Sequence, residues 1–112
     1  MVDLFNYQRR DTVMVQIGAT PLGGGCPIRL QSMTDTSTMH TEESAAQVMR
    51  IAAAGGEYVR LTTQGVREAE NLRHINAVVR GAGCDVPLVA DVHFNPRVAE
   101  VAALYAEKVR IN

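Results

Sequence analysis

Polar residues end three apolar runs of the chain in the same pattern, two positions apart in each run. The three pairs are Arg60 with Thr62, Asp91 with His93, and Arg110 with Asn112. In an extended strand, side chains at positions i and i+2 lie on one face, roughly 6.6–6.8 Å apart. If the three strands are parallel neighbours, these groups meet at the carboxyl edge of the sheet, where α/β sheets and barrels bind anions and substrates.

The two arginines predict an anion site at this edge. Each lies in an otherwise apolar strand, where an unpaired guanidinium is costly and a phosphate or carboxylate matches its planar geometry. A structural ion pair, for example between Arg60 and Asp91, is the alternative for one arginine alone. Two arginines at equivalent strand ends favour ligand binding, with Arg110 as the second cation.

Asp91 and His93 end the most apolar strand and can act as general acid and base or as metal ligands. Two ligands are too few for a stable metal site, so we expect no metal here, and a hydrogen bond from His93 to a backbone carbonyl is a simpler alternative. The hydroxyl-rich stretch 31–39 leaves the first strand at the same edge. Its hydroxyls either donate to phosphate oxygens or only form a turn.

Alternating strands and helices must position these residues. The sequence predicts strands over 28–33, 58–62, 86–92 and 108–112. A first helix is predicted after an N-cap at Thr41. A second is predicted over 66–79, with Leu72 and Val78 facing inward. A third is predicted after an N-cap at Asn95, with Pro96 at its first position. Residues 12–17, with the glycine-rich turn that follows them, predict a short β arm before the first strand.

This order predicts an α/β fold of parallel βα repeats. The strands recur at about 30 and then about 20 residues, as in right-handed crossovers, and form the N-terminal half of a TIM (β/α)8 barrel. A complete barrel needs ~200 residues or more, so residues 1–112 are expected to be a partial barrel domain of a larger protein. A doubly wound open sheet is the competing architecture, although no G-x-G-x-x-G motif follows a strand.

Composition excludes several classes of partner. A net charge of −1 and a pI near 6.3 argue against nucleic acid, and no apolar segment is long enough to predict a membrane span. Cys26 and Cys84 lie far apart and form no C-x-x-C motif, which favours free thiols in a reducing compartment. We therefore expect a cytoplasmic protein.

Four segments in this order carry a resemblance to a known family. They are residues 27–34, 56–62, 86–94 and 109–112, preceded by shorter matches at residues 9–12 and 21–23. Over nearly its whole length the chain resembles the 4-hydroxy-3-methylbut-2-enyl diphosphate synthases. The stretch 62–70 resembles the longer, three-domain form of that family.

The resemblance implies part of an iron–sulfur oxidoreductase of the methylerythritol phosphate pathway of isoprenoid biosynthesis. That enzyme converts 2-C-methyl-D-erythritol 2,4-cyclodiphosphate to 4-hydroxy-3-methylbut-2-enyl diphosphate, with electrons from a ferredoxin or flavodoxin. Carried over by motif, Arg60 and Arg110 would bind the diphosphate, and Asp91, His93 and Asn112 would surround the substrate.

The resemblance also implies a 4Fe–4S cluster in the full-length enzyme, held by a separate domain outside this chain. Neither Cys26 nor Cys84 lies in a cluster motif. We therefore expect these 112 residues alone to bind no cluster, to contain no assignable catalytic residue and to have no activity. The parent protein is expected to form a homo-oligomer.

Two other functions stay open at this point. One is a phosphate-binding barrel synthase without redox chemistry, of the dihydropteroate synthase type, which needs no downstream cysteine cluster. The other is a non-catalytic interaction module in which Arg60 and Asp91 only pair with each other. If the protein binds no ligand and substitution of Arg60 or Arg110 only lowers its stability, it is an interaction module.

Overall fold

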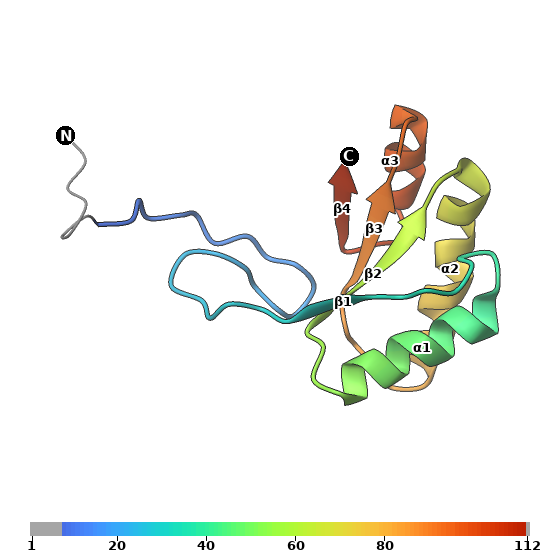
Figure 1. Cartoon of the computed structure of the whole chain (residues 1–112), viewed down its shortest axis with the longest axis horizontal. Helices are drawn as coiled ribbons and strands as arrows, with labels where there is room; N and C mark the ends of the chain where they lie inside the picture. The colour runs from blue at the N-terminus through green and yellow to red at the C-terminus, as the bar shows by residue number, and fades with distance from the viewer. Residues whose placement is uncertain (1–7, 112) are drawn as a thin grey trace.

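The structure is a computed structural model that describes residues 8–111 (Figure 1). Asn112, one of the predicted site residues, lies outside the described residues. Within the described part, four parallel strands form one sheet in the order β1-β2-β3-β4. They are β1 (Gln31–Met33), β2 (Tyr58–Thr63), β3 (Leu88–Val92) and β4 (Lys108–Ile111).

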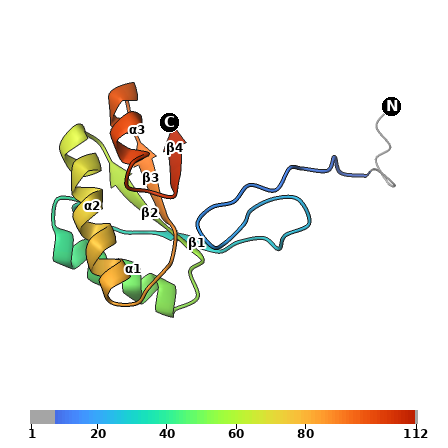
Figure 2. The same ribbon diagram turned by 180° about the vertical axis from the view of Figure 1, so that it is seen from behind.

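Three helices connect these strands, and all three cover the same face of the sheet (Figures 1 and 2). They are α1 (Thr41–Ala53), α2 (Val66–Gly81) and α3 (Pro96–Ala102). Sequential parallel strands with every helix on one face form a sector of a barrel, whereas a doubly wound sheet carries helices on both faces. The predicted parallel βα repeats are therefore confirmed.

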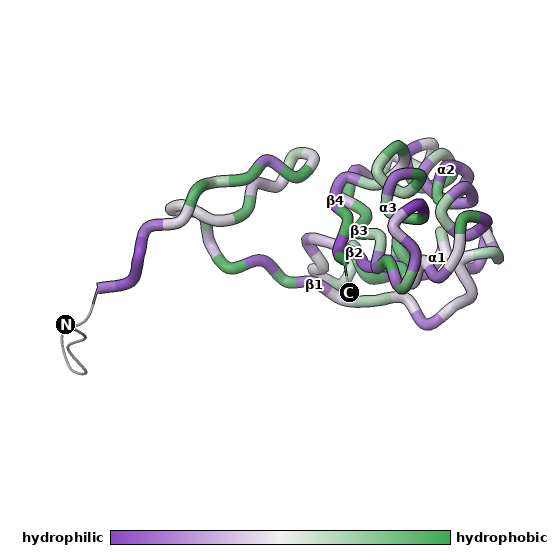
Figure 3. The backbone as a smooth tube through the Cα atoms, turned by 90° about the horizontal axis from the view of Figure 1, so that it is seen from above, coloured by the Kyte–Doolittle hydropathy of each residue, from purple (hydrophilic) through white to green (hydrophobic). Residues whose placement is uncertain are grey.

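The main core lies between the sheet and the helices. Strand residues such as Leu61 and Ala90 are fully buried against Leu72 and Ile75 of α2, and Figure 3 shows hydrophobic (green) stretches in both the strands and the helices. Val78 was predicted to face this core, but it is 41% exposed. Among residues 8–111, no helix has the length and apolar character needed to cross a membrane.

The helix starts agree only in part with the sequence prediction. Asn95 is the N-cap of α3 as predicted, since its side chain accepts a hydrogen bond from the backbone N–H of Arg97. Thr41 is not the N-cap of α1: His40 occupies that position without a side-chain cap, and Thr41 is already helical. The Thr41 hydroxyl instead accepts a hydrogen bond from the side chain of Asn71 in α2, at 3.0 Å.

The predicted N-terminal arm folds back on itself, with one antiparallel bridge between Val15 and Leu22. Ile17 of this arm is 3% exposed and packs against Tyr58 and Val89, on the sheet face opposite the helices. Tyr58 is the first residue of β2. The arm therefore covers the amino-terminal end of the face that would line a barrel, while the rest of it extends away from the sheet (Figure 1).

A glutamate immediately before β2 fixes the start of that strand. The backbone N–H of Glu57 donates to the carbonyl of Leu30 at 2.7 Å, and the Glu57 carboxylate accepts from the N–H of Leu30 at 3.1 Å. The carboxylate also pairs with Arg29 at 2.9 Å. The Leu30 amide and the Arg29 guanidinium lower the pKa of Glu57, so its carboxylate is ionised. We call this pair of hydrogen bonds between one glutamate and one leucine, with the arginine that pairs with the glutamate, the glutamate clasp.

The same clasp recurs immediately before β4. The backbone N–H of Glu107 donates to the carbonyl of Leu88 at 3.1 Å, and its carboxylate accepts from the N–H of Leu88 at 2.8 Å. Its ion-pair partner is Arg80. The pairs β1–β2 and β3–β4 are therefore built in the same way at their amino-terminal ends.

Candidate functional site

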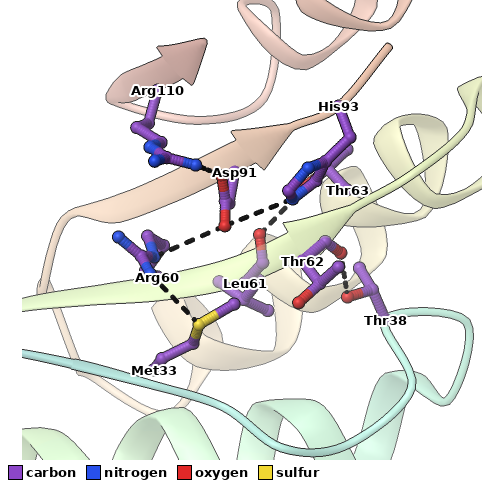
Figure 4. Close-up of polar contacts among 9 residues, drawn as sticks. All are labelled: Met33, Thr38, Arg60, Leu61, Thr62, Thr63, Asp91, His93 and Arg110. Atoms are coloured by element: carbon purple, nitrogen blue, oxygen red, sulfur yellow. Dashed lines mark hydrogen bonds and ion pairs between the residues drawn. The ribbon is translucent and has the colours of Figure 1, made fainter. Parts of the chain in front are cut away.

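Charged side chains from three neighbouring strands gather on the sheet face opposite the helices (Figure 4). Arg60 lies in β2, Asp91 in β3 and Arg110 in β4, and His93 follows β3 directly. Asp91 is paired in register with Arg110 across β3 and β4. Four of the five predicted site residues are thus brought together in the described part of the chain, and the fifth, Asn112, lies outside it.

Asp91 is the centre of this cluster and is only 3% exposed. Its Oδ1 accepts a hydrogen bond from Arg110 Nη1 at 2.8 Å. Its Oδ2 lies 3.6 Å from Arg60 Nε and 3.4 Å from His93 Nε2. One buried carboxylate therefore holds two guanidiniums and an imidazole together.

The charges around Asp91 keep it ionised. Burial alone would raise the pKa of Asp91, but the hydrogen bond and charge of Arg110, with the charges of Arg60 and His93, outweigh burial and lower it. A carboxyl group with a lowered pKa accepts hydrogen bonds and does not donate a proton at neutral pH. Asp91 is therefore suited to orienting cations and not to acting as a general acid.

Arg60 is bound less completely than Arg110. Its Nη2 donates to the sulfur of Met33 at 3.5 Å, and its Nε is buried with no hydrogen-bond partner in residues 8–111. The side chains of Arg60 and Arg110 are 30% and 43% exposed, so both are partly accessible to solvent. Two guanidiniums against one carboxylate leave a positive charge uncompensated, and an anion matches this charge.

Phe94, directly after His93, has an unusual backbone conformation. Its φ is 66°, in the left-handed region that residues other than glycine rarely adopt, and its side chain is 96% exposed. The ring lies against the imidazole of His93, with centroids 5.9 Å apart. Such strain costs of order 1–3 kcal/mol and clusters at functional sites, so this bend supports a site at the end of β3.

The hydroxyl-rich stretch after β1 is mostly engaged with the protein itself. Thr38 Oγ1 donates to the carbonyl of Thr62, and the Ser44 hydroxyl donates to the carbonyl of Ser37. These bonds tie the loop to β2 and α1, which favours the interpretation as a structured turn. Thr34 Oγ1 is the exception, because it is buried without a hydrogen-bond partner in the described residues.

The described residues contain no group of three or more histidine, cysteine, aspartate or glutamate side chains that could hold a metal ion. Cys26 and Cys84 are free and partly buried. Met33 is the contact that sequence reasoning missed: it lies in the stretch 31–39, but nothing singled out its sulfur as a partner of Arg60. The contact follows from the register of β1 and β2, which pairs Met33 with Arg60 and which the sequence alone does not give.

Comparison with known proteins identifies the relatives of this chain. The family model described as the GcpE TIM-barrel domain matches residues 12–112. The chain is 70% identical over 111 residues to the "4-hydroxy-3-methylbut-2-en-1-yl diphosphate synthase (flavodoxin)" of Phocaeicola vulgatus. It is 59% identical over 112 residues to the protein of that name from Porphyromonas gingivalis, and 47% identical over 108 residues to the one from Leptospira interrogans.

These matches cover 99%, 100% and 96% of the chain, respectively. They cover 18%, 19% and 16% of the relatives. The chain therefore spans less than a fifth of the length of these curated relatives.

Proposed function

Because the chain belongs to the GcpE TIM-barrel domain family, we propose that it supplies substrate-binding residues to a 4-hydroxy-3-methylbut-2-en-1-yl diphosphate synthase. The substrate would be 2-C-methyl-D-erythritol 2,4-cyclodiphosphate, which the whole enzyme opens reductively in isoprenoid biosynthesis. Residues 1–112 would form part of the barrel, and the remaining strands and an iron–sulfur domain would come from other parts of the protein.

The observation that carries this proposal is the convergence of Arg60 and Arg110 on Asp91. Planar guanidiniums bind phosphate oxygens through paired hydrogen bonds, and two of them on one face can hold both phosphates of a diphosphate. The side chains of Arg60 and Arg110 are 30% and 43% exposed. Both side chains can therefore be reached by a ligand, and Asp91 orients Arg110 through a 2.8 Å hydrogen bond.

The remaining residues have supporting roles in this proposal. His93 lies 3.4 Å from Asp91, at the end of β3 where a substrate hydroxyl or phosphate oxygen could meet its imidazole. An imidazole there can hold or move a proton at its ring nitrogen. Asn112 is assigned by its motif, two positions after Arg110.

The described residues do not fit an iron–sulfur cluster, because they offer no group of three suitable ligands. A 4Fe–4S cluster of the whole enzyme would be bound by another part of the protein. The relatives carry flavodoxin in their names, so a flavodoxin is the electron donor in this proposal. The matches name diphosphate synthases, which favours the reductive enzyme over one of the dihydropteroate synthase type.

The test is calorimetric titration of the cyclodiphosphate into the full-length protein and its Arg60→Ala and Arg110→Ala variants. A hydrogen bond between charged groups contributes about 1.5–3 kcal/mol, so each variant should bind about 10- to 100-fold more weakly. Arg73→Ala, an exposed arginine of α2 outside the cluster, is the matched control and should bind like the parent protein. Unchanged affinity in both site variants, with a lowered melting temperature, would show that the arginines only form a structural ion pair.

A further inference from the structure

The two arginines of the site occupy equivalent positions in the two strand pairs. Met33 is paired in register with Arg60 across β1 and β2, as Asp91 is with Arg110 across β3 and β4. Met33 and Asp91 each lie three residues after a leucine, Leu30 or Leu88, that is hydrogen-bonded to a glutamate. Arg60 and Arg110 each lie three residues after that glutamate, Glu57 or Glu107. Met33 and Asp91 are thus structural counterparts.

The two counterparts differ in charge. Arg110 donates to the carboxylate of Asp91 at 2.8 Å, whereas Arg60 donates to the thioether sulfur of Met33 at 3.5 Å. A thioether is a weak, uncharged hydrogen-bond acceptor on a flexible side chain, so it can orient a guanidinium without neutralising it. Asp91 does not form a hydrogen bond with Arg60 as it does with Arg110, because its Oδ2 lies 3.6 Å from Arg60 Nε.

We propose that Met33 is a positioning residue that orients Arg60 through its sulfur and leaves the guanidinium charge available to a phosphate group. This inference rests on the proposed function, since it concerns the same anion site. A carboxylate at position 33 would give Arg60 the partner that Arg110 already has. The cluster would then hold two guanidiniums and two carboxylates, and its preference for an anion would fall.

The chain offers a matched pair of substitutions that separates charge from shape. Met33→Gln keeps the length of the side chain and an uncharged acceptor for Arg60, and Met33→Glu differs from it only by the charge. Met33→Leu keeps the apolar volume but removes the acceptor. Gln31→Glu is the control for general electrostatics, since Gln31 lies on the same face of β1, roughly 6.6–6.8 Å further from the site.

The experiment is calorimetric titration of inorganic pyrophosphate into the full-length protein at fixed ionic strength, with the melting temperature of each variant recorded. Met33→Glu should bind at least ten-fold more weakly than Met33→Gln. Met33→Leu should bind about three-fold more weakly than Met33→Gln, because Arg60 loses its orienting acceptor. Gln31→Glu should lower the affinity by less than three-fold.

Equal affinities of the Glu and Gln variants would overturn the role of Met33, and so would an equal loss in all three Met33 variants, which indicates packing alone. If Met33→Glu does not fold, the comparison of the Leu and Gln variants decides, and equal binding by these two overturns the proposal. Arg60→Ala in the same titration separates the two hypotheses. If it weakens pyrophosphate binding while the Met33 variants do not, only the role of Met33 fails; if it changes nothing, the anion site itself fails.

Discussion

Asp91→Asn is the substitution that most directly tests the charge arrangement of the cluster. The asparagine has the shape of the aspartate and can still accept a hydrogen bond from Arg110, but it removes the buried negative charge. Arg60 and Arg110 then face each other without a counter-ion. We therefore expect the sheet to be destabilised around β3 and β4.

The size of this effect follows from the contacts of Asp91. A hydrogen bond to a charged group contributes about 1.5–3 kcal/mol, and the 2.8 Å bond from Arg110 is of this kind. The contacts at 3.4 and 3.6 Å add less. Because Arg60 and Arg110 are 30% and 43% exposed, solvent screens part of the repulsion that the substitution leaves. We expect a loss of about 2 kcal/mol, which corresponds to roughly 30-fold more frequent local opening.

Hydrogen–deuterium exchange of peptides from β3 and β4 measures this local opening without requiring two-state unfolding of the whole protein. The difference should depend on pH. The pKa of Asp91 is lowered in the folded protein, so its stabilising contribution is present above the unfolded value of about 3.9 and is lost as the pH falls through the folded pKa. The difference between parent and variant should therefore be full at pH 7 and smaller at pH 3, after correction for intrinsic exchange rates.

Asp85→Asn is the matched control, because this aspartate is exposed in the connection before β3. It should leave exchange in both strands within three-fold of the parent protein. Equal protection of the Asp91→Asn variant and the parent at pH 7 would refute the reasoning. A difference of the same size at pH 7 and pH 3 would refute its electrostatic basis.

Three further substitutions test the elements that position the site. Asn95→Ala removes the side-chain cap of α3 and should lower the free energy of unfolding by about 1 kcal/mol, measured by hydrogen exchange in α3. Tyr58→Phe removes the hydroxyl that donates to the carbonyl of Thr20, and limited proteolysis should then cleave the N-terminal arm faster. Glu107→Gln weakens the clasp at the start of β4 and should speed exchange of the Leu88 amide by about ten-fold, while Glu100→Gln on α3 should not.

The order and type of the elements could be predicted because apolar strands and amphipathic helices differ in period. The strand limits were less predictable, because they depend on pairing. The first strand was expected over 28–33, yet Ile28 is 92% exposed and the strand begins at Gln31. The third was expected from residue 86, but Pro87 has no N–H to donate to a ladder, and the strand begins at Leu88.

The face of α2 and the start of α1 were predicted incorrectly in detail. Leu72 and Val79 are buried, but Val78 lies far enough around the helix to be exposed. Thr41 has the residue type of an N-cap, but residue type does not reveal that α2 lies close enough for Asn71 to bind its hydroxyl. Tertiary contacts of this kind leave no local pattern in a sequence.

The gathering of the cluster was predictable because Arg60, Asp91 and Arg110 each lie near the carboxyl end of a strand, and the carboxyl ends of parallel strands meet at one edge of the sheet. Its internal pairing was not. Which oxygen of Asp91 meets which arginine depends on the register between strands, and spacing within one strand does not give that register. The sulfur of Met33 as the contact of Arg60 is a consequence of the same register.

The cluster is difficult to explain as a contribution to the stability of the sheet. Asp91 is the charged residue of a strand that is otherwise apolar and buried throughout. Replacing a buried ion pair by apolar residues of similar size is often neutral or stabilising, whereas removing one partner alone is costly. Val89 shows that a branched apolar side chain is accommodated on the same face of β3. A fold that needed only stability could therefore fill this face with apolar residues. The excess positive charge of two arginines beside one carboxylate is better explained by a bound anion that balances it.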